Sequence, residues 1–117
     1  MSGAVSYYGG LAAEDQVAAD YQRRGYEICG HRWRGKGGEI DLIAKDREGF
    51  IFIEVKKARD FARAVERLTQ HQLQRIYNAA GEFLGGTPQG LNTQSRIDVA
   101  LVNGSGNIEI IENAFGH

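Results

Sequence analysis

The chain has almost no cysteine and no long hydrophobic run, and each absence excludes a class of protein. Cys29 is the only cysteine among 117 residues, which excludes an intramolecular disulfide and a CxxC metal knuckle and predicts a half-buried free thiol. No run of about 18 apolar residues occurs, and residues 1–10 lack the charged start and apolar centre of a signal peptide. We therefore expect a cytoplasmic protein without a membrane segment.

An excess of positive charge is also lacking. The formal net charge is -1 and the isoelectric point is near 6.3, which argues against a protein that coats nucleic acid by charge alone. Any binding of nucleic acid must therefore come from local patches. His31, His71 and His117 show neither HxxxH nor HExxH spacing, so the sequence does not predict a zinc site.

The residues that are present predict one domain of helices and strands. Apolar positions that recur at three and four predict helices over residues 10–24 and from a Thr69 cap to about Leu84. Runs of bulky residues between turn residues predict strands over 26–34, 39–45, 50–56, 96–102 and 108–111, while 58–67 are a loop or a short helix. Residues 1–9 are expected to be a flexible N-terminal segment and residues 10–117 a single domain.

The order of these elements predicts an α/β fold. Short turns join the first three strands, which should therefore form an antiparallel meander. A helix links the third strand to the fourth and suggests a parallel crossover. We expect a mixed sheet flanked by helices.

Three charged residues interrupt the apolar strands of the meander. Glu54 and Lys56 share a strand face with Phe50 and Phe52, and the short turn brings Asp41 alongside them. An isolated charge on a covered strand is costly, so these residues require a partner or a function. Two carboxylates suit Mg²⁺, which takes one or two of them together with water and substrate phosphate. Lys56 would then orient the attacking water or stabilise charge on the phosphate.

A purely structural interpretation stands beside this one. Glu54 and Lys56 could be a same-face ion pair at a strand end, and Asp41 could cap the turn network. Glu14, a possible third carboxylate on the inward stripe of the first helix, could be a solvated helix residue. Three charged side chains directed to one region favour the metal site, because perturbed groups gather at functional sites.

These residues resemble the PD-(D/E)xK nuclease superfamily and, more closely, the YraN family of predicted nucleases, which is related to archaeal Holliday-junction resolvases. The similarity rests on Gly-x-x-x-Glu and Gly25-Tyr26 in the first helix, Arg34 before Gly38-Glu39-Ile40-Asp41-Leu42-Ile43, Phe52-Ile53-Glu54-Val55-Lys56, Arg96-x-Asp98-Val99 and Asn113-Ala114-Phe115. It implies a restriction-endonuclease-like αβββαβ core and a nuclease that acts on branched or flapped DNA during repair or recombination. A homodimer is plausible, because a four-way junction needs two symmetric cuts.

The resemblance also implies roles for individual residues. Asp41 and Glu54 would bind Mg²⁺ or Mn²⁺ together with the Val55 carbonyl, Lys56 would be the catalytic lysine, and Glu14 the helix carboxylate. The chain departs from the family pattern in having Lys57-Ala58-Arg59 after the motif, Gln72 in place of a lysine, and Arg32 in place of an asparagine. Gln72 could bind water or phosphate, or could belong to the Thr69 capping box.

Basic residues near these motifs could contact a nucleic-acid backbone. The candidates are Arg32, Arg34, Lys36, Lys57, Arg59 and Gln72, with Arg63 and Arg67 further along; a solvated polar face explains them equally well. Trp33 is expected to pack at a rim rather than to stack on bases. Arg96 and Asp98 share a strand face and are expected to form a structural ion pair.

The sequence leaves three functions open. The first is a metal-dependent DNA endonuclease. The second is a non-catalytic nucleic-acid-binding module that kept the fold, and the third is a partner-dependent adaptor with residues 108–111 as an exposed edge strand.

Overall fold

A computed structural model describes the backbone of residues 3–114 and the side chains of residues 12–114. The helices are α1 (Gly3–Arg23), α2 (Phe61–Glu66) and α3 (Gln70–Gly85), with a short 3-10 helix η1 (Gly90–Asn92). The strands are β1 (Glu27–Arg34), β2 (Glu39–Lys45), β3 (Phe50–Lys57), β4 (Ser95–Val102) and β5 (Ile108–Ile111). In this part of the chain no helix is long and apolar enough to cross a membrane.

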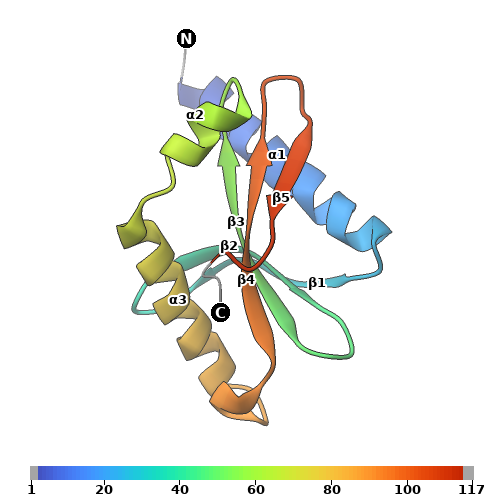
Figure 1. Ribbon diagram of the computed structural model, residues 1–117, viewed down its shortest axis with the longest axis vertical. Coiled ribbons are helices and arrows are strands. Elements are labelled where there is room, and N and C mark those ends of the chain that lie inside the picture. Colours follow the sequence, from blue (N-terminus) through green and yellow to red (C-terminus); the bar gives the residue numbers. More distant parts are fainter. Residues whose placement is uncertain (1–2, 115–117) are drawn as a thin grey trace.

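The strands form one five-stranded mixed sheet in the order β1-β2-β3-β4-β5 (Figure 1). β1, β2 and β3 are an antiparallel meander, β3 and β4 are parallel, and β5 is antiparallel to β4. The predicted α/β fold with a mixed sheet flanked by helices is therefore confirmed, and it is consistent with a restriction-endonuclease-like core.

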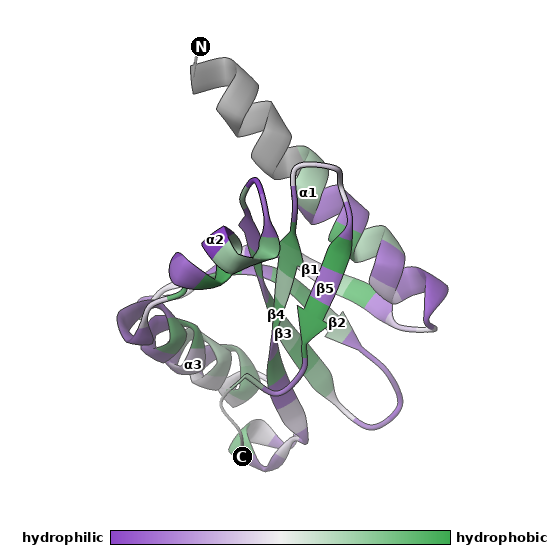
Figure 2. Cartoon of the chain, turned by 45° about the horizontal axis from the view of Figure 1, so that its top comes forward, coloured by the Kyte–Doolittle hydropathy of each residue, from purple (hydrophilic) through white to green (hydrophobic). Residues whose placement is uncertain are grey.

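The helices cover the two faces of the sheet. α1 packs through Ala13, Val17 and Tyr21 on one face, whereas α2 and α3 pack on the other face. The centre of the sheet is correspondingly apolar and the turns are hydrophilic (Figure 2). Because both faces are covered, a charged side chain in the middle of these strands must have a partner.

Most predicted elements agree with the structure, but the start of the first helix and the burial of Cys29 do not. α1 begins at Gly3, so the predicted start at Gly10 is too late; the flexibility predicted for residues 1–9 stays a prediction. The undecided segment 58–67 contains the helix α2. Cys29 is exposed rather than half-buried, and it lies at the register shift between Ile28 and Gly30 in β1.

A buried charge, Asp98, links α1 to the sheet. Asp98 on β4 is fully buried and accepts hydrogen bonds from the Tyr21 hydroxyl at 2.6 Å, Arg96 Nε at 3.0 Å and the Asn113 amide at 3.0 Å. Burial and the neighbouring Asp98 raise the pKa of Tyr21, so its hydroxyl stays protonated as the donor. The predicted Arg96–Asp98 ion pair is confirmed, and it is part of the core.

The pairing of β2 breaks at Asp41. Leu42 pairs with Ile53 as the last pair of the β2–β3 ladder, and residues 39 and 40 pair with β1 instead. Ile40 and Ile43 pack on the α3 side while Leu42 and Ala44 pack on the α1 side, so the regular alternation of faces is lost between Ile40 and Leu42.

The turn before β2 is held against α3, and this turns β2 away from β3. The Glu82 carboxylate accepts hydrogen bonds from the amides of Lys36 and Gly37, each at 2.7 Å. A side chain at Gly38 would meet the Arg75 carbonyl oxygen at 3.0 Å, so this approach of turn and helix requires glycine. β2 therefore lies beside α3 at its start and pairs with β3 at its end. Asp41 lies between these two parts of the strand.

Candidate functional site

Asp41 lies where β2 separates from β3, and its side chain bridges the gap. Asp41 Oδ2 accepts a hydrogen bond from the backbone amide of Val55 at 2.8 Å. The carboxylate thus occupies a position that a ladder carbonyl would take in a regular sheet. The sequence did not indicate this contact, because Ile40 and Leu42 keep the apolar alternation of an unbroken strand. The contact joins Asp41 to the strand that carries Glu54 and Lys56.

Glu54 lies beside Asp41 and is poorly solvated. Its side chain is 13% exposed, and Lys56 Nζ lies 3.4 Å from Glu54 Oε2. Burial, then a hydrogen bond and charge repulsion from Asp41, raise the pKa of Glu54 to about 9, although Lys56 acts in the opposite direction. Glu54 therefore carries a proton near neutral pH when no cation lies beside it.

Glu14 reaches the same region from α1. Its side chain is 13% exposed and is paired with Arg32, whose Nε lies 3.2 Å from Glu14 Oε2. Burial and the charge of Asp41 raise the pKa of Glu14, while Arg32 lowers it. Arg32 has a positive φ of 49°, a strained conformation for this residue type. Glu14 thus lies near Asp41, with Arg32 as its counter-charge, and its role as a third carboxylate stays a prediction.

The donor set fits a hard divalent cation. The poorly solvated Glu54 holds a proton beside Asp41, so a cation between the two carboxylates would replace that proton and relieve their repulsion. Within residues 12–114, no three acidic, histidine or cysteine side chains gather into a complete metal cage. Mg²⁺ is usually held by one or two carboxylates, with water and substrate phosphates completing its shell, so a pair of carboxylates is a sufficient protein contribution.

A profile described as uncharacterised protein family UPF0102 matches residues 13–102, which include α1 from Ala13, the meander and β4. The chain belongs to this family. The expected membership of the YraN family is thereby confirmed, because the two names describe the same family.

Individual relatives match over almost the whole chain. A UPF0102 protein of Ruegeria pomeroyi is 53% identical over 98% of this chain and 94% of its own length. A UPF0102 protein of Cereibacter sphaeroides is 56% identical over 98% of both chains. A more distant relative from Dinoroseobacter shibae is 42% identical over 89% of this chain and 78% of its own length. The family is therefore bacterial in these examples, and its description assigns no activity.

The predicted nucleic-acid-binding residues divide into two groups. Arg32 and Arg34 are already paired with Glu14 and Glu39, with Arg34 Nε 2.9 Å from Glu39 Oε2. Lys36, Lys57 and Arg59 are exposed on the turn before β2 and at the end of β3. Binding through any of them stays a prediction.

Gln72 has only half of the predicted capping box. Thr69 caps α3 by accepting a hydrogen bond from the Gln72 amide at 3.0 Å. Gln72 Oε1 is buried and has no hydrogen-bond partner among the described residues. In a complete capping box this side chain would accept a hydrogen bond from the backbone amide of Thr69. The Gln72 side chain is therefore not explained by helix capping, and its contact with water or phosphate stays a prediction.

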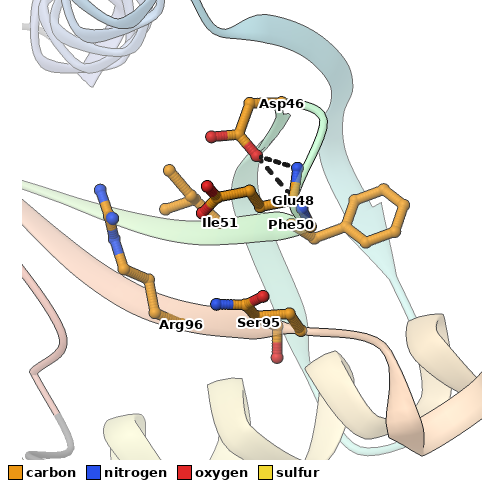
Figure 3. Close-up of a pocket in the computed structure, with 8 residues that line it drawn as sticks. Asp46, Glu48, Phe50, Ile51, Ser95 and Arg96 are labelled. Atoms are coloured by element: carbon orange, nitrogen blue, oxygen red, sulfur yellow. Dashed lines mark hydrogen bonds between the residues drawn. The ribbon is translucent and has the colours of Figure 1, made fainter.

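A small hollow of about 80 Å³ lies at the start of β3 (Figure 3). It is lined by the turn before β3 and the start of β4. In this turn the Asp46 carboxylate accepts hydrogen bonds from the backbone amides of Glu48 and Gly49. These contacts close a tight turn. Neither Asp41 nor Glu54 lines this hollow, so it is separate from the candidate site that these two residues form.

The raised pKa of Glu54 predicts how a neutral substitution changes stability. A carboxyl group whose pKa is higher in the folded protein favours folding below its unfolded pKa of 4.5, and this contribution is lost as the pH rises from 4.5 towards 9. In EDTA, Glu54→Gln is therefore expected to raise the melting temperature at pH 8 by roughly 4 °C or more, and much less at pH 5. Thermal melts at both pH values measure the difference.

Glu109→Gln provides the control for this prediction, because Glu109 is an exposed carboxylate on β5. It is expected to leave the melting temperature unchanged at either pH. A melting temperature of Glu54→Gln below that of the unchanged protein at pH 8 would show that the Glu54–Lys56 ion pair stabilises the fold, and would support the structural interpretation.

Proposed function

We propose that this protein is a divalent-metal-dependent endonuclease that hydrolyses DNA phosphodiester bonds. The observation that supports it is the pair of adjacent carboxylates, Asp41 and the poorly solvated Glu54, placed beside Lys56 at the break in the β2–β3 ladder. If these charged residues had no function, neutral side chains in their place would make the protein more stable. A placement that costs stability and brings together oxygen ligands and an ammonium group is typical of a catalytic site.

Each residue has a role in this proposal. Asp41 and Glu54 would hold Mg²⁺ or Mn²⁺, with the Val55 carbonyl as a further ligand. The bound cation supplies a water of lowered pKa and neutralises charge on the phosphate. Lys56 would orient the attacking water or stabilise the negative charge that develops on the phosphate oxygens. Glu14, held by Arg32, would be the third carboxylate at the site.

Branched or flapped DNA, as handled in repair or recombination, is the proposed substrate. This part of the proposal is supported by the resemblance to junction-resolving nucleases. A homodimer belongs to the same proposal, because symmetric cutting of a four-way junction requires two sites.

The direct test is cleavage of end-labelled DNA. Four-way, flapped, single-stranded and linear duplex substrates are each incubated with Mg²⁺, Mn²⁺ or EDTA, and products are separated on denaturing gels. We expect cutting of the branched substrates with either metal and none in EDTA. Equal cutting of linear duplex would contradict the proposed substrate class. Binding of DNA without any cutting would favour the non-catalytic binding module.

A further inference from the structure

The cations of this chain differ in whether a carboxylate neutralises them. At the end of α1 and along β1, the arginines pair with carboxylates: Arg23 and Arg24 with Asp20, Arg32 with Glu14 and Arg34 with Glu39. Their charge is compensated within the protein. In contrast, Arg59, Arg67 and Arg75 form no ion pair with a carboxylate in the described part of the chain.

These uncompensated cations belong to one stretch of sequence. Between residues 57 and 75 there are five Lys or Arg and two Asp or Glu, giving a net charge of +3 in a chain whose formal net charge is -1. Clustered Lys and Arg on one surface are the electrostatic signature of a nucleic-acid contact, provided that the surface lies beside the site it serves.

Arg67 and Arg59 are fixed close to the end of β3. Arg67 Nη1 donates a hydrogen bond to the Lys57 carbonyl at 2.9 Å, next to Lys56. The Arg59 carbonyl accepts a hydrogen bond from the Gly104 amide at 2.9 Å. The neighbouring Ala58 amide donates a hydrogen bond to the Val102 carbonyl at 3.0 Å. Ala64 of α2 is buried against β4, so the helix between the two arginines is anchored as well. The backbone positions of both arginines are therefore set by the sheet.

Arg75 occupies the corresponding position beside β2. Its backbone and Cβ lie against Gly38, three residues before Asp41, and its Nε lies 3.5 Å from the Gly37 carbonyl oxygen. All three arginine side chains are exposed. Arg67 thus adjoins the strand that carries Glu54, and Arg75 adjoins the strand that carries Asp41.

Exposed aromatic side chains are scarce on this surface. Trp33 packs edge-on against Phe83 with ring centroids 5.6 Å apart, as expected for a rim residue. Among the described residues the exposed large hydrophobic side chains are Val65, Tyr77 and Leu91. Binding of single strands without sequence preference usually depends on several aromatic platforms, whereas contacts to duplex phosphates need only cations.

We propose that Arg59, Arg67 and Arg75 form a phosphate-binding surface that holds the backbone of a nucleic-acid duplex across the strand ends carrying Asp41 and Glu54. The inference rests on the proposed function in assigning that duplex as the substrate. The binding is independent of sequence, because phosphate contacts carry no base information. Each contact releases counterions, so the affinity falls steeply with salt.

The test is the salt dependence of binding in EDTA, where the proposed metal-dependent reaction is prevented. Fluorescently labelled DNA duplex, RNA duplex and single-stranded DNA are titrated with the protein between about 50 and 200 mM salt. Arg67→Gln/Arg75→Gln is expected to weaken duplex binding at least about 10-fold and to reduce the slope of log affinity against log salt by about 1.8, since each lost contact removes about 0.9.

Two further variants separate charge from folding. Arg23→Gln/Arg47→Gln removes the same charge from exposed positions at the end of α1 and in the turn before β3, and should retain the slope and an affinity within about 3-fold of the unchanged protein. Arg67→Lys/Arg75→Lys keeps the charge and should restore most of the lost affinity. Thermal melts of every variant identify loss of binding that follows from unfolding.

The outcomes distinguish this inference from the nuclease proposal. A reduced slope in Arg67→Gln/Arg75→Gln supports the surface even if no variant cuts DNA, a result that would contradict the nuclease alone. An unchanged slope in a protein that cuts DNA overturns the surface and leaves the nuclease intact. Equal effects of the control pair, preferred binding of single strands, or no binding at low salt would also overturn the inference. DNA and RNA duplexes show which backbone is preferred.

Discussion

Asp41→Asn is expected to reduce metal-dependent DNA cleavage by at least about 10³-fold, which corresponds to about 4 kcal/mol of transition-state stabilisation. The amide removes the negative charge that would hold a divalent cation beside Glu54. It keeps an oxygen that can accept the hydrogen bond from the Val55 amide, now 2.8 Å from Asp41 Oδ2. The variant should therefore fold, and gel assays of product yield with Mg²⁺ or Mn²⁺ measure the loss.

Asp46 provides a matched control for the substitution of Asp41. Asp46 is also an aspartate that accepts backbone amides, those of Glu48 and Gly49, but it lies at the other end of β2. Asp46→Asn makes the same chemical change and should leave cleavage within about 3-fold of the unchanged protein. Asp41→Ala, Glu54→Ala and Lys56→Ala should each abolish cutting. Cleavage that persists in Asp41→Asn would defeat the assignment of this carboxylate as a metal ligand.

The largest loss of stability is expected from Asp98→Ala. This substitution leaves the Tyr21 hydroxyl, the Arg96 guanidinium and the Asn113 amide without their buried acceptor. Removing one partner of a buried charge network costs about 3–5 kcal/mol, a large part of the total stability of a small domain. The melting temperature should fall by roughly 12 °C or more. Urea and thermal unfolding curves, recorded by circular dichroism, measure the loss.

Tyr21→Phe tests the contribution of one hydrogen bond in the same network. It removes only the hydroxyl, which lies 2.6 Å from Asp98 Oδ2, while Arg96 and the Asn113 amide remain as partners. The expected cost is about 1–3 kcal/mol. Both variants should retain cleavage per folded molecule, because the network is on β4 and α1 and not at the carboxylate pair. A loss from Asp98→Ala of less than about 1 kcal/mol would contradict this account of the core.

The local elements of the fold could be predicted from the sequence because their signals are local. β2 and β5 have the predicted bounds, and Thr69 caps α3 as predicted. The parallel arrangement of β3 and β4 followed from the helix that connects them. Glu54 and Lys56 were predicted to share a face, and they are paired in the structure.

The contacts that complete the site could not be predicted in this way. The break at Asp41 is hidden because the residues on either side of it are apolar, as in a regular strand. The ion pair of Arg32 with Glu14 joins α1 to β1, and Arg32 requires a positive φ that its residue type does not signal. Tyr21 and Asp98 are 77 residues apart. Such contacts depend on how whole elements pack, which no local pattern encodes.

The parallel pairing of β3 with β4 has a consequence for the order in which the protein folds. Phe50 pairs with Ser95 across a long connection, whereas the meander pairs residues that are close in sequence and Asp41 is only 14 residues from Val55. Long loops close slowly, so we expect the meander to form before β4 joins it. The two carboxylates can therefore meet while water still surrounds them. Their repulsion becomes costly only when the later elements dock, which places the electrostatic penalty of the site late in the folding reaction.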